Sequence, residues 1–115
     1  MPRDRESLFD ILEAAALVIE EAGGKTVDDI LSSASLQAII CFRFIVIGEA
    51  AARLSDATAA RYPQLPLSHM RRMRNVITHE YDDVDFGAVM KTVREDLPPL
   101  VVELERILSE DWPTD

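Results

Sequence analysis

Cysteine is nearly absent from this sequence, and patterns that form β-strands are scarce. One cysteine in 115 residues excludes an internal disulfide. The first six residues, Met1 to Glu6, contain no apolar segment of the kind that a secretory signal needs. We therefore expect the protein to reside in a reducing cytoplasm.

Basic residues are also few. The chain has 12 Lys and Arg and 21 Asp and Glu, which gives a formal net charge of −9. This balance argues against a surface that coats nucleic acid or an anionic membrane as a whole. The charge is unevenly spread: residues 1–42 carry −5, residues 43–79 carry +4 and residues 80–115 carry −8. Any contact with a polyanion is therefore expected to be local and to involve the basic middle.

Apolar residues recur at spacings of three and four along the chain, which is typical of amphipathic helices. With 48% apolar residues and this length, the chain can build one small core. We predict an all-α bundle of four to five helices that forms one domain over residues 1–115. The expected helices are residues 7–22, a short helix capped by Thr26, residues 36–54, a helix that begins near Leu67 and a last helix after Asp83.

The segment from Leu36 to Leu54 is apolar on almost every side, so we expect it to be buried on several sides, with Cys41 as a buried structural thiol. A membrane span is the competing interpretation, but Arg43, Glu49 and Arg53 interrupt the run before it reaches about 18 uncharged residues. We therefore expect no membrane association. In a domain this small, a helix that is apolar all round indicates that a second copy of the chain covers one side.

The last helix carries an apolar stripe that alternates steps of four and three. Pro98 and Pro99 have no backbone N–H and would break the interior of an α-helix, yet the spacing of the apolar residues continues unchanged across them. We expect a kink there or two collinear helices. The stripe comprises Phe86, Met90, Val93, Leu97, Leu100, Leu104 and Ile107.

The segment from Ser68 to Tyr81 gathers polar side chains on about 160° of one helix. The opposite arc is apolar and comprises Met70, Met73, Val76 and Ile77, so we expect it to be buried. A polar arc is ordinarily a solvated face. A cluster of arginines, however, is easier to understand if it meets an anion such as phosphate, and histidine can transfer a proton near neutral pH. These groups would suit phosphodiester cleavage, and in RNA the 2′-hydroxyl supplies a nucleophile without a metal. The arc comprises Arg71, Arg72, Arg74, Asn75, Thr78 and His79.

Residues 74–81, Arg-Asn-Val-Ile-Thr-His-Glu-Tyr, resemble the R-x4-H-x-Y motif of HepT-like proteins, a branch of the all-helical HEPN superfamily. The resemblance covers essentially the whole chain, with similar patterns at residues 47–54, at Val84-Asp85 and at residues 95–98. Leu67 departs from it, since many relatives carry an aromatic residue at that position. We expect this departure to affect packing rather than chemistry.

The resemblance implies a toxin of a HepT/MntA-type toxin–antitoxin system, with metal-independent ribonuclease activity and no cofactor. Arg74 and His79 would be the catalytic pair, and Asn75 would orient them. A partner nucleotidyltransferase of the MNT type, acting as antitoxin, would add AMP to Tyr81 and thereby exclude RNA. Arg71 and Arg72 are further candidates for contacts with RNA phosphates.

Transesterification needs a base and an acid, but each chain offers one suitable histidine. A twofold dimer would bring two copies of His79 to one cleft, and HEPN ribonucleases are understood to act as such dimers. We expect His69 to have a packing or surface role. Glu49 could face the cleft, but an ion pair with Arg53, four residues later on its own helix, is the simpler explanation. The alternative function is a non-catalytic HEPN module that binds a nucleotide or acts as partner of a nucleotidyltransferase; a purely structural dimer is a third possibility.

Overall fold

The computed structural model describes residues 3–114, and within this range the chain forms helices and no strands. The helices are α1 (Asp4–Ala22), α2 (Val27–Leu31), α3 (Ala34–Arg53), α4 (Asp56–Arg61), α5 (Leu67–His79), α6 (Phe86–Lys91) and α7 (Leu97–Asp111). A 3-10 turn, η1 (Tyr81–Asp83), follows α5, and a π-helical turn, η2 (Thr92–Asp96), joins α6 to α7. The predicted all-α bundle is confirmed.

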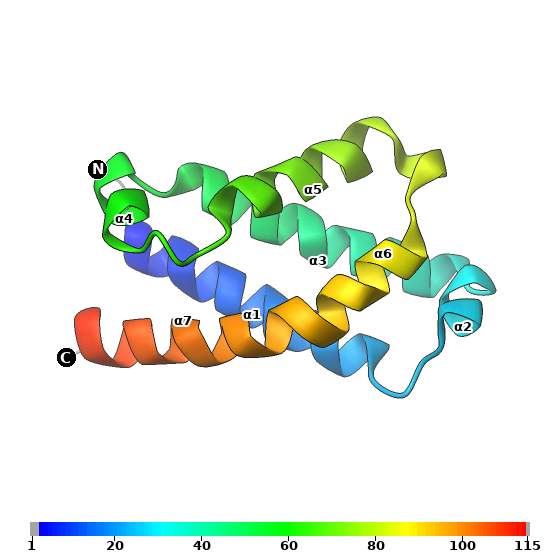
Figure 1. Cartoon of the computed structure of the whole chain (residues 1–115), viewed down its shortest axis with the longest axis horizontal. Coiled ribbons are helices and arrows are strands. Elements are labelled where there is room, and N and C mark those ends of the chain that lie inside the picture. Colours follow the sequence, from blue (N-terminus) through cyan, green and yellow to red (C-terminus); the bar gives the residue numbers. More distant parts are fainter. Residues whose placement is uncertain (1–2, 115) are drawn as a thin grey trace.

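Four long helical rods run side by side, formed by α1, α3, α5 and the continuous α6–η2–α7 segment (Figure 1). α3 packs against both α1 and α5, and α7 packs against α1. The short helices α2 and α4 lie at opposite ends of the bundle, whose principal extents are 44 × 28 × 21 Å. The buried apolar residues of α1, α2, α3, α5, α6 and α7 form one cluster, so the core is continuous.

Local signals in the sequence fix where several helices begin. Thr26 and Asp29 form a reciprocal capping box at α2, as expected from Thr26. The side chains of Ser33, Ser55 and Asp85 each accept a hydrogen bond from a backbone N–H in the first turn of α3, α4 and α6. These caps satisfy amide groups that would otherwise lack partners, so the boundaries follow from residue type.

Helix α3 is the central helix of the bundle, and its length and composition alone would also suit a membrane span. One face, including Cys41, Phe44 and Ile47, is buried in the core. On another side, Arg43 and Arg53 form ion pairs with carboxylates of α1. The position of α3 between two packed helices therefore explains its apolar sequence.

The opposite face of α3 leaves large apolar side chains in contact with solvent. Phe42 is 53% exposed and Ile39 is 36% exposed. Phe42 precedes Glu49 by seven residues, which is about two helical turns, so the two share this face. Within a single chain α3 is therefore buried on some sides only, and an exposed apolar strip remains. The second copy expected to cover one side of α3 stays a prediction.

The apolar stripe predicted for the last helix is confirmed, since all seven of its residues are buried. The break expected at Pro98 and Pro99 takes the form of η2, the π-helical turn just before them. Two prolines remove backbone donors that an α-helix needs. In η2 the Leu97 N–H bonds to the Thr92 carbonyl five residues back, so the helix continues without a gap.

The beginning of α1 is hydrogen-bonded to the first turn of α4. The Asp4 carboxylate accepts hydrogen bonds from the backbone N–H of Ser55 and from the hydroxyls of Ser55 and Thr58. Burial acts to raise the pKa of Asp4, but these three hydrogen bonds outweigh it and hold the pKa below its ordinary value. The carboxylate therefore joins α1 to the cap of α4 in its charged form.

Candidate functional site

Helix α5 carries the polar arc, and it is fixed to the bundle by its other side. Met70 and Ile77 are buried and Met73 is half-buried, as the apolar spacing predicted. Val76, which was expected on the same apolar side, is 43% exposed. The result is a helix that presents Asn75, Thr78 and His79 to solvent.

Arg74 is the most constrained member of the arc. Its Nε and Nη2 donate hydrogen bonds of 3.1 and 2.9 Å to Oδ1 of Asn75. Its Nη1 lies 3.6 Å from Oε2 of Glu49 on α3, and the side chain is 22% exposed. Asn75 therefore orients the guanidinium group of Arg74, while Glu49 neutralises it from the neighbouring helix.

The pairing of Glu49 with Arg74 overturns an expectation from the sequence. Glu49 was expected to pair with Arg53, four residues later on the same helix, but Arg53 pairs instead with Asp10 of α1 at 3.2 Å. Spacing within one helix could not reveal the partner, because the approach of α5 to α3 supplies it. Glu49 therefore belongs to the candidate site, although its spacing in the sequence favoured a pair with Arg53.

Gly48 explains why α5 can approach α3 so closely at this point. A Cβ atom added to Gly48 would overlap Cβ of Arg74 and lie 2.8 Å from the Met70 carbonyl oxygen. Both neighbours belong to α5, so only glycine permits this separation of the helices. Gly48 and Glu49 together set the position and the charge environment of Arg74.

His79 is the last residue of α5 and is exposed. The helix ends there because Glu80 leaves the helical conformation while its N–H still bonds to the Val76 carbonyl. Tyr81 follows in η1 and is 46% exposed. Both side chains are therefore accessible to a substrate or to a partner protein.

Helices α3 and α5 run antiparallel, which relates His79 to the exposed strip on α3 (Figure 1). Gly48 lies level with Arg74, and His79 is five residues, or about 7.5 Å, further along α5. The same distance back along α3 reaches the level of Arg43, next to Phe42. The candidate catalytic histidine therefore lies level with an exposed aromatic side chain.

Within residues 3–114, Arg71 and Arg72 lack the carboxylate or backbone carbonyl partners that the other arginines have. Eight of the ten arginines contact a carboxylate or a backbone carbonyl within residues 3–114. Arg71 bonds only to the Ser68 hydroxyl, at 3.3 Å, and Arg72 makes no hydrogen bond or ion pair within that range. In so acidic a chain, two uncompensated guanidinium groups on one helix indicate a site for an anion.

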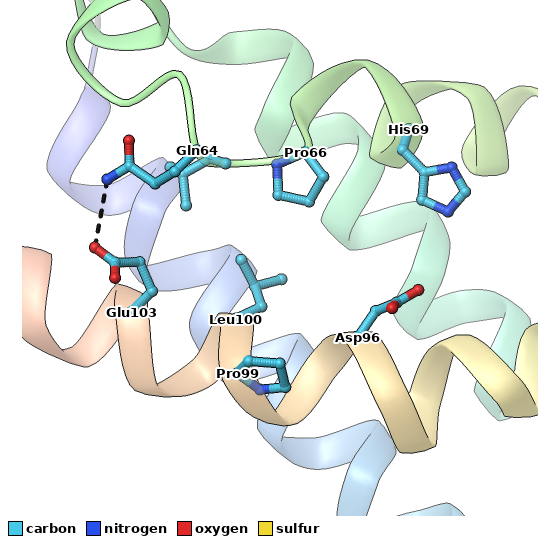
Figure 2. Close-up of a pocket in the computed structure, with 8 residues that line it drawn as sticks. Gln64, Pro66, His69, Asp96, Pro99, Leu100 and Glu103 are labelled. Carbon is cyan, nitrogen blue, oxygen red and sulfur yellow. Dashed lines mark hydrogen bonds between the residues drawn. The ribbon is translucent and has the colours of Figure 1, made fainter.

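His69 lies outside the polar arc, as expected, and is exposed. It lines a small pocket between α5 and α6 and also the rim of a larger groove (Figure 2). This groove encloses about 610 Å³ between α7 and the segment that leads into α5. Figure 2 shows Asp96 and Glu103 along one side of it, with Gln64 hydrogen-bonded to Glu103. Because two carboxylates repel phosphate, this groove is a poor phosphate site, and none of the polar-arc residues lines it.

Within residues 3–114, no group of three or more His, Cys, Asp and Glu side chains is arranged to hold a metal ion. Cys41 is buried in the core, and burial raises the pKa of its thiol. A neutral, inaccessible thiol has a packing role, as the sequence predicted.

Comparison with known proteins places these features in a family. The profile of the family described as "Ribonuclease HepT-like" matches residues 11–107. A protein of Thermococcus cleftensis named "Probable ribonuclease HepT" is 31% identical over 103 residues, which cover 90% of this chain and 94% of that protein. A protein of Methanocaldococcus jannaschii named "Putative RNase" is 29% identical over 98 residues, which cover 85% of this chain and 90% of that protein.

A second protein of Methanocaldococcus jannaschii is named as both a gamma-glutamylcyclotransferase and a putative RNase. It is 33% identical over 103 residues, and the chain spans only 46% of its length. No solved structure matches the chain. The profile match over most of the sequence and the full-length relatives lead to one conclusion: the chain belongs to the ribonuclease HepT-like family.

Proposed function

We propose that the chain is a metal-independent endoribonuclease of the HEPN type. The observation that carries this proposal is the polar arc of α5, where an oriented Arg74 and an accessible His79 lie beside two uncompensated arginines. Arginine stabilises phosphoryl charge and imidazole transfers protons near neutral pH, so the arc supplies both needs of phosphodiester cleavage. Membership in the ribonuclease HepT-like family supports the same activity.

The proposed reaction uses the 2′-hydroxyl of RNA as nucleophile. One His79 imidazole takes the proton from the 2′-hydroxyl as the O2′–P bond forms. A second, protonated imidazole gives its proton to the 5′-oxygen as the P–O5′ bond breaks. The products are a 2′,3′-cyclic phosphate and a 5′-hydroxyl end, and Arg74 stabilises the pentavalent phosphorane between them.

Two imidazoles require two chains, so the active form is proposed to be a twofold dimer in the cytoplasm. The exposed Phe42 and Ile39 on α3 support this arrangement, because a second copy would cover them. Phe42 shares a face of α3 with Glu49, and Glu49 contacts Arg74. A dimer built on this strip would bring two sets of site residues toward one cleft.

The chain is further proposed to be the toxin of a HepT/MntA-type toxin–antitoxin pair. A partner nucleotidyltransferase would transfer AMP to the hydroxyl of Tyr81, with release of pyrophosphate from ATP. The exposure of Tyr81 supports this step, since 46% of the residue is accessible. An adenylyl phosphate there would place negative charge two residues from His79 and compete with RNA.

The decisive experiment incubates the purified, unmodified chain with single-stranded RNA in EDTA. The expected result is cleavage that leaves cyclic phosphate ends. Replacing His79 by Ala is expected to abolish cleavage, because the proton-transfer group is removed from an exposed position that contributes no core packing. Arg3→Ala, which removes a largely exposed side chain just before α1, is the control and is expected to retain activity. Full activity in His79→Ala would overturn the assignment.

A second candidate function is a non-catalytic HEPN module that binds a nucleotide. It is favoured by the same Arg71 and Arg72, since unpaired guanidinium groups bind phosphate whether or not it is cleaved. Tight RNA binding without cleavage by the unmodified dimer would select this function over the ribonuclease.

A further inference from the structure

A second concave site lies on the other side of α5 from Arg74, between α5 and α6. It encloses about 250 Å³, which is smaller than the roughly 300–1,000 Å³ typical of pockets for drug-sized ligands. Its walls are mainly apolar and come from both helices and the segment between them. They include Met73, Val76, Ile77, Val84, Ala88 and Val89. The space therefore suits one small, flat, apolar group.

Polar groups at the edge of this pocket have hydrogen-bonding capacity left over. Oδ1 of Asp85 accepts a bond from the Ala88 N–H, at 3.1 Å, as the cap of α6, and within residues 3–114 its Oδ2 has no donor. The Thr92 hydroxyl donates to the Ala88 carbonyl, at 3.3 Å, so its oxygen can still accept. The pocket thus offers two acceptors to a ligand.

Arg72 adds a positive charge to the rim of the same pocket. It precedes His79 by seven residues, so the two side chains lie on one side of α5 about 10.5 Å apart along the helix. One or two nucleotide units can span this distance. A base in the pocket, with its phosphate at Arg72, would therefore belong to the same RNA strand that reaches His79.

From these observations we propose that the α5–α6 pocket is a subsite for a single unstacked RNA base, with preference for bases that carry an exocyclic amino group. Proteins read single-stranded RNA by accepting splayed bases on apolar side chains and bonding to their edges. The amino groups of adenine, cytosine and guanine are donors, whereas uracil lacks an amino group and carries its one ring N–H between two carbonyl oxygens. Asp85 accepts this donor, and Arg72 holds the adjoining phosphate. The inference rests on the proposed ribonuclease function, which supplies RNA as the ligand.

Binding is measured without cleavage by using the His79→Ala chain and the four ribonucleoside 5′-monophosphates. Methyl NMR signals of Met73, Val76 and Ala88 report directly on the pocket. CMP, AMP or GMP is expected to shift these signals with a Kd in the millimolar range. UMP is expected to bind about tenfold more weakly, because its one ring N–H donor lies between two carbonyl oxygens, which the Asp85 carboxylate would repel.

Two substitutions test the pocket in different ways. Asp85→Asn keeps a good helix cap but removes the charge, so it should reduce the preference against UMP to about twofold or less. Ala88→Leu fills the pocket and should abolish the methyl shifts, whereas Ala16→Leu, on an exposed position of α1, should leave them intact. Circular dichroism confirms that each variant folds; if Ala88→Leu does not, Thr92→Leu closes the same pocket from η2.

The outcomes separate this inference from the proposed function. Absence of methyl shifts with all four nucleotides at about 10 mM overturns the subsite. If the methyl signals change when the chain dimerises but do not respond to any nucleotide, the subsite is also overturned and the pocket is assigned to a protein interface. Pocket shifts with CMP but not UMP, in a chain that cleaves no RNA, support the subsite and reject the ribonuclease. Cleavage of RNA with no base preference and no pocket shift rejects only the subsite.

Discussion

Replacing Gly48 by Ala tests whether the close approach of α3 and α5 positions the candidate site. The added Cβ would lie 2.8 Å from the Met70 carbonyl oxygen, whereas ordinary contacts require roughly 3.5 Å. The carbonyl would have to move by about 0.7 Å, and Cβ of Arg74, which the new atom overlaps, would have to move further. Because both obstacles are parts of α5, the helix itself must shift.

The expected cost has a structural part and a functional part. Overpacking a well-packed contact destabilises a protein by about 1–3 kcal/mol, which would lower Tm by about 4–20 °C in a domain of this size. A displacement near 1 Å at a catalytic group costs about 100-fold in rate. We therefore expect Gly48→Ala to reduce RNA cleavage about 100-fold at a temperature where the chain remains folded.

The assay combines thermal unfolding, followed by circular dichroism, with RNA cleavage well below Tm. Gly87→Ala is the matched control, since it makes the same change in helix α6, where the added Cβ would meet only Oδ1 of Asp85, at 3.2 Å. It should change stability by less than about 1 kcal/mol. Wild-type stability and activity in Gly48→Ala would refute the argument that this glycine sets the position of Arg74.

Three further predictions concern single polar side chains. Glu49→Gln should tighten RNA binding several-fold at low salt, because a phosphate no longer competes with the carboxylate 3.6 Å from Arg74; unchanged affinity in a filter-binding assay would contradict this. Tyr81→Phe should abolish AMP addition by the partner enzyme, seen as loss of the whole-AMP increment in intact mass. Asp4→Asn should lower the free energy of unfolding by about 1.5–3 kcal/mol at pH 7. Since the folded-state pKa of Asp4 is lowered, this difference should shrink as pH falls below about 4, and a pH-independent difference in urea unfolding would count against it.

The sequence predicted the helices well because periodicity and capping are local properties. Thr26 marks the start of α2, and the stripe from Phe86 to Ile107 marks the last rod, as the structure confirms. The sequence also predicted the buried thiol of Cys41. In each case the information lies within a few residues of the feature that it determines.

The site was only partly predictable, because two of its contacts depend on packing between helices. The motif singled out Arg74 and Asn75, and these two side chains are hydrogen-bonded. The predicted partner of Glu49 was wrong, because Glu49 pairs with Arg74 across the contact between α3 and α5 and not with Arg53 on its own helix. Gly48 stood in the pattern that resembled the family, yet its role emerges only when the second helix is in place.

The π-helical turn η2 determines where the continuous α6–η2–α7 segment can lose a residue. A π turn is equivalent to one extra residue absorbed locally in an α-helix, so the apolar faces of α6 and α7 keep their alignment on either side of it. Removing one residue between Thr92 and Asp96 would convert the turn toward ordinary α-helix and leave both faces in phase. Removing one residue within α7 would instead rotate everything beyond it by about 100° and turn Leu104 and Ile107 away from the core. Of these two segments, η2 is therefore the one whose length can change by one residue without loss of the bundle.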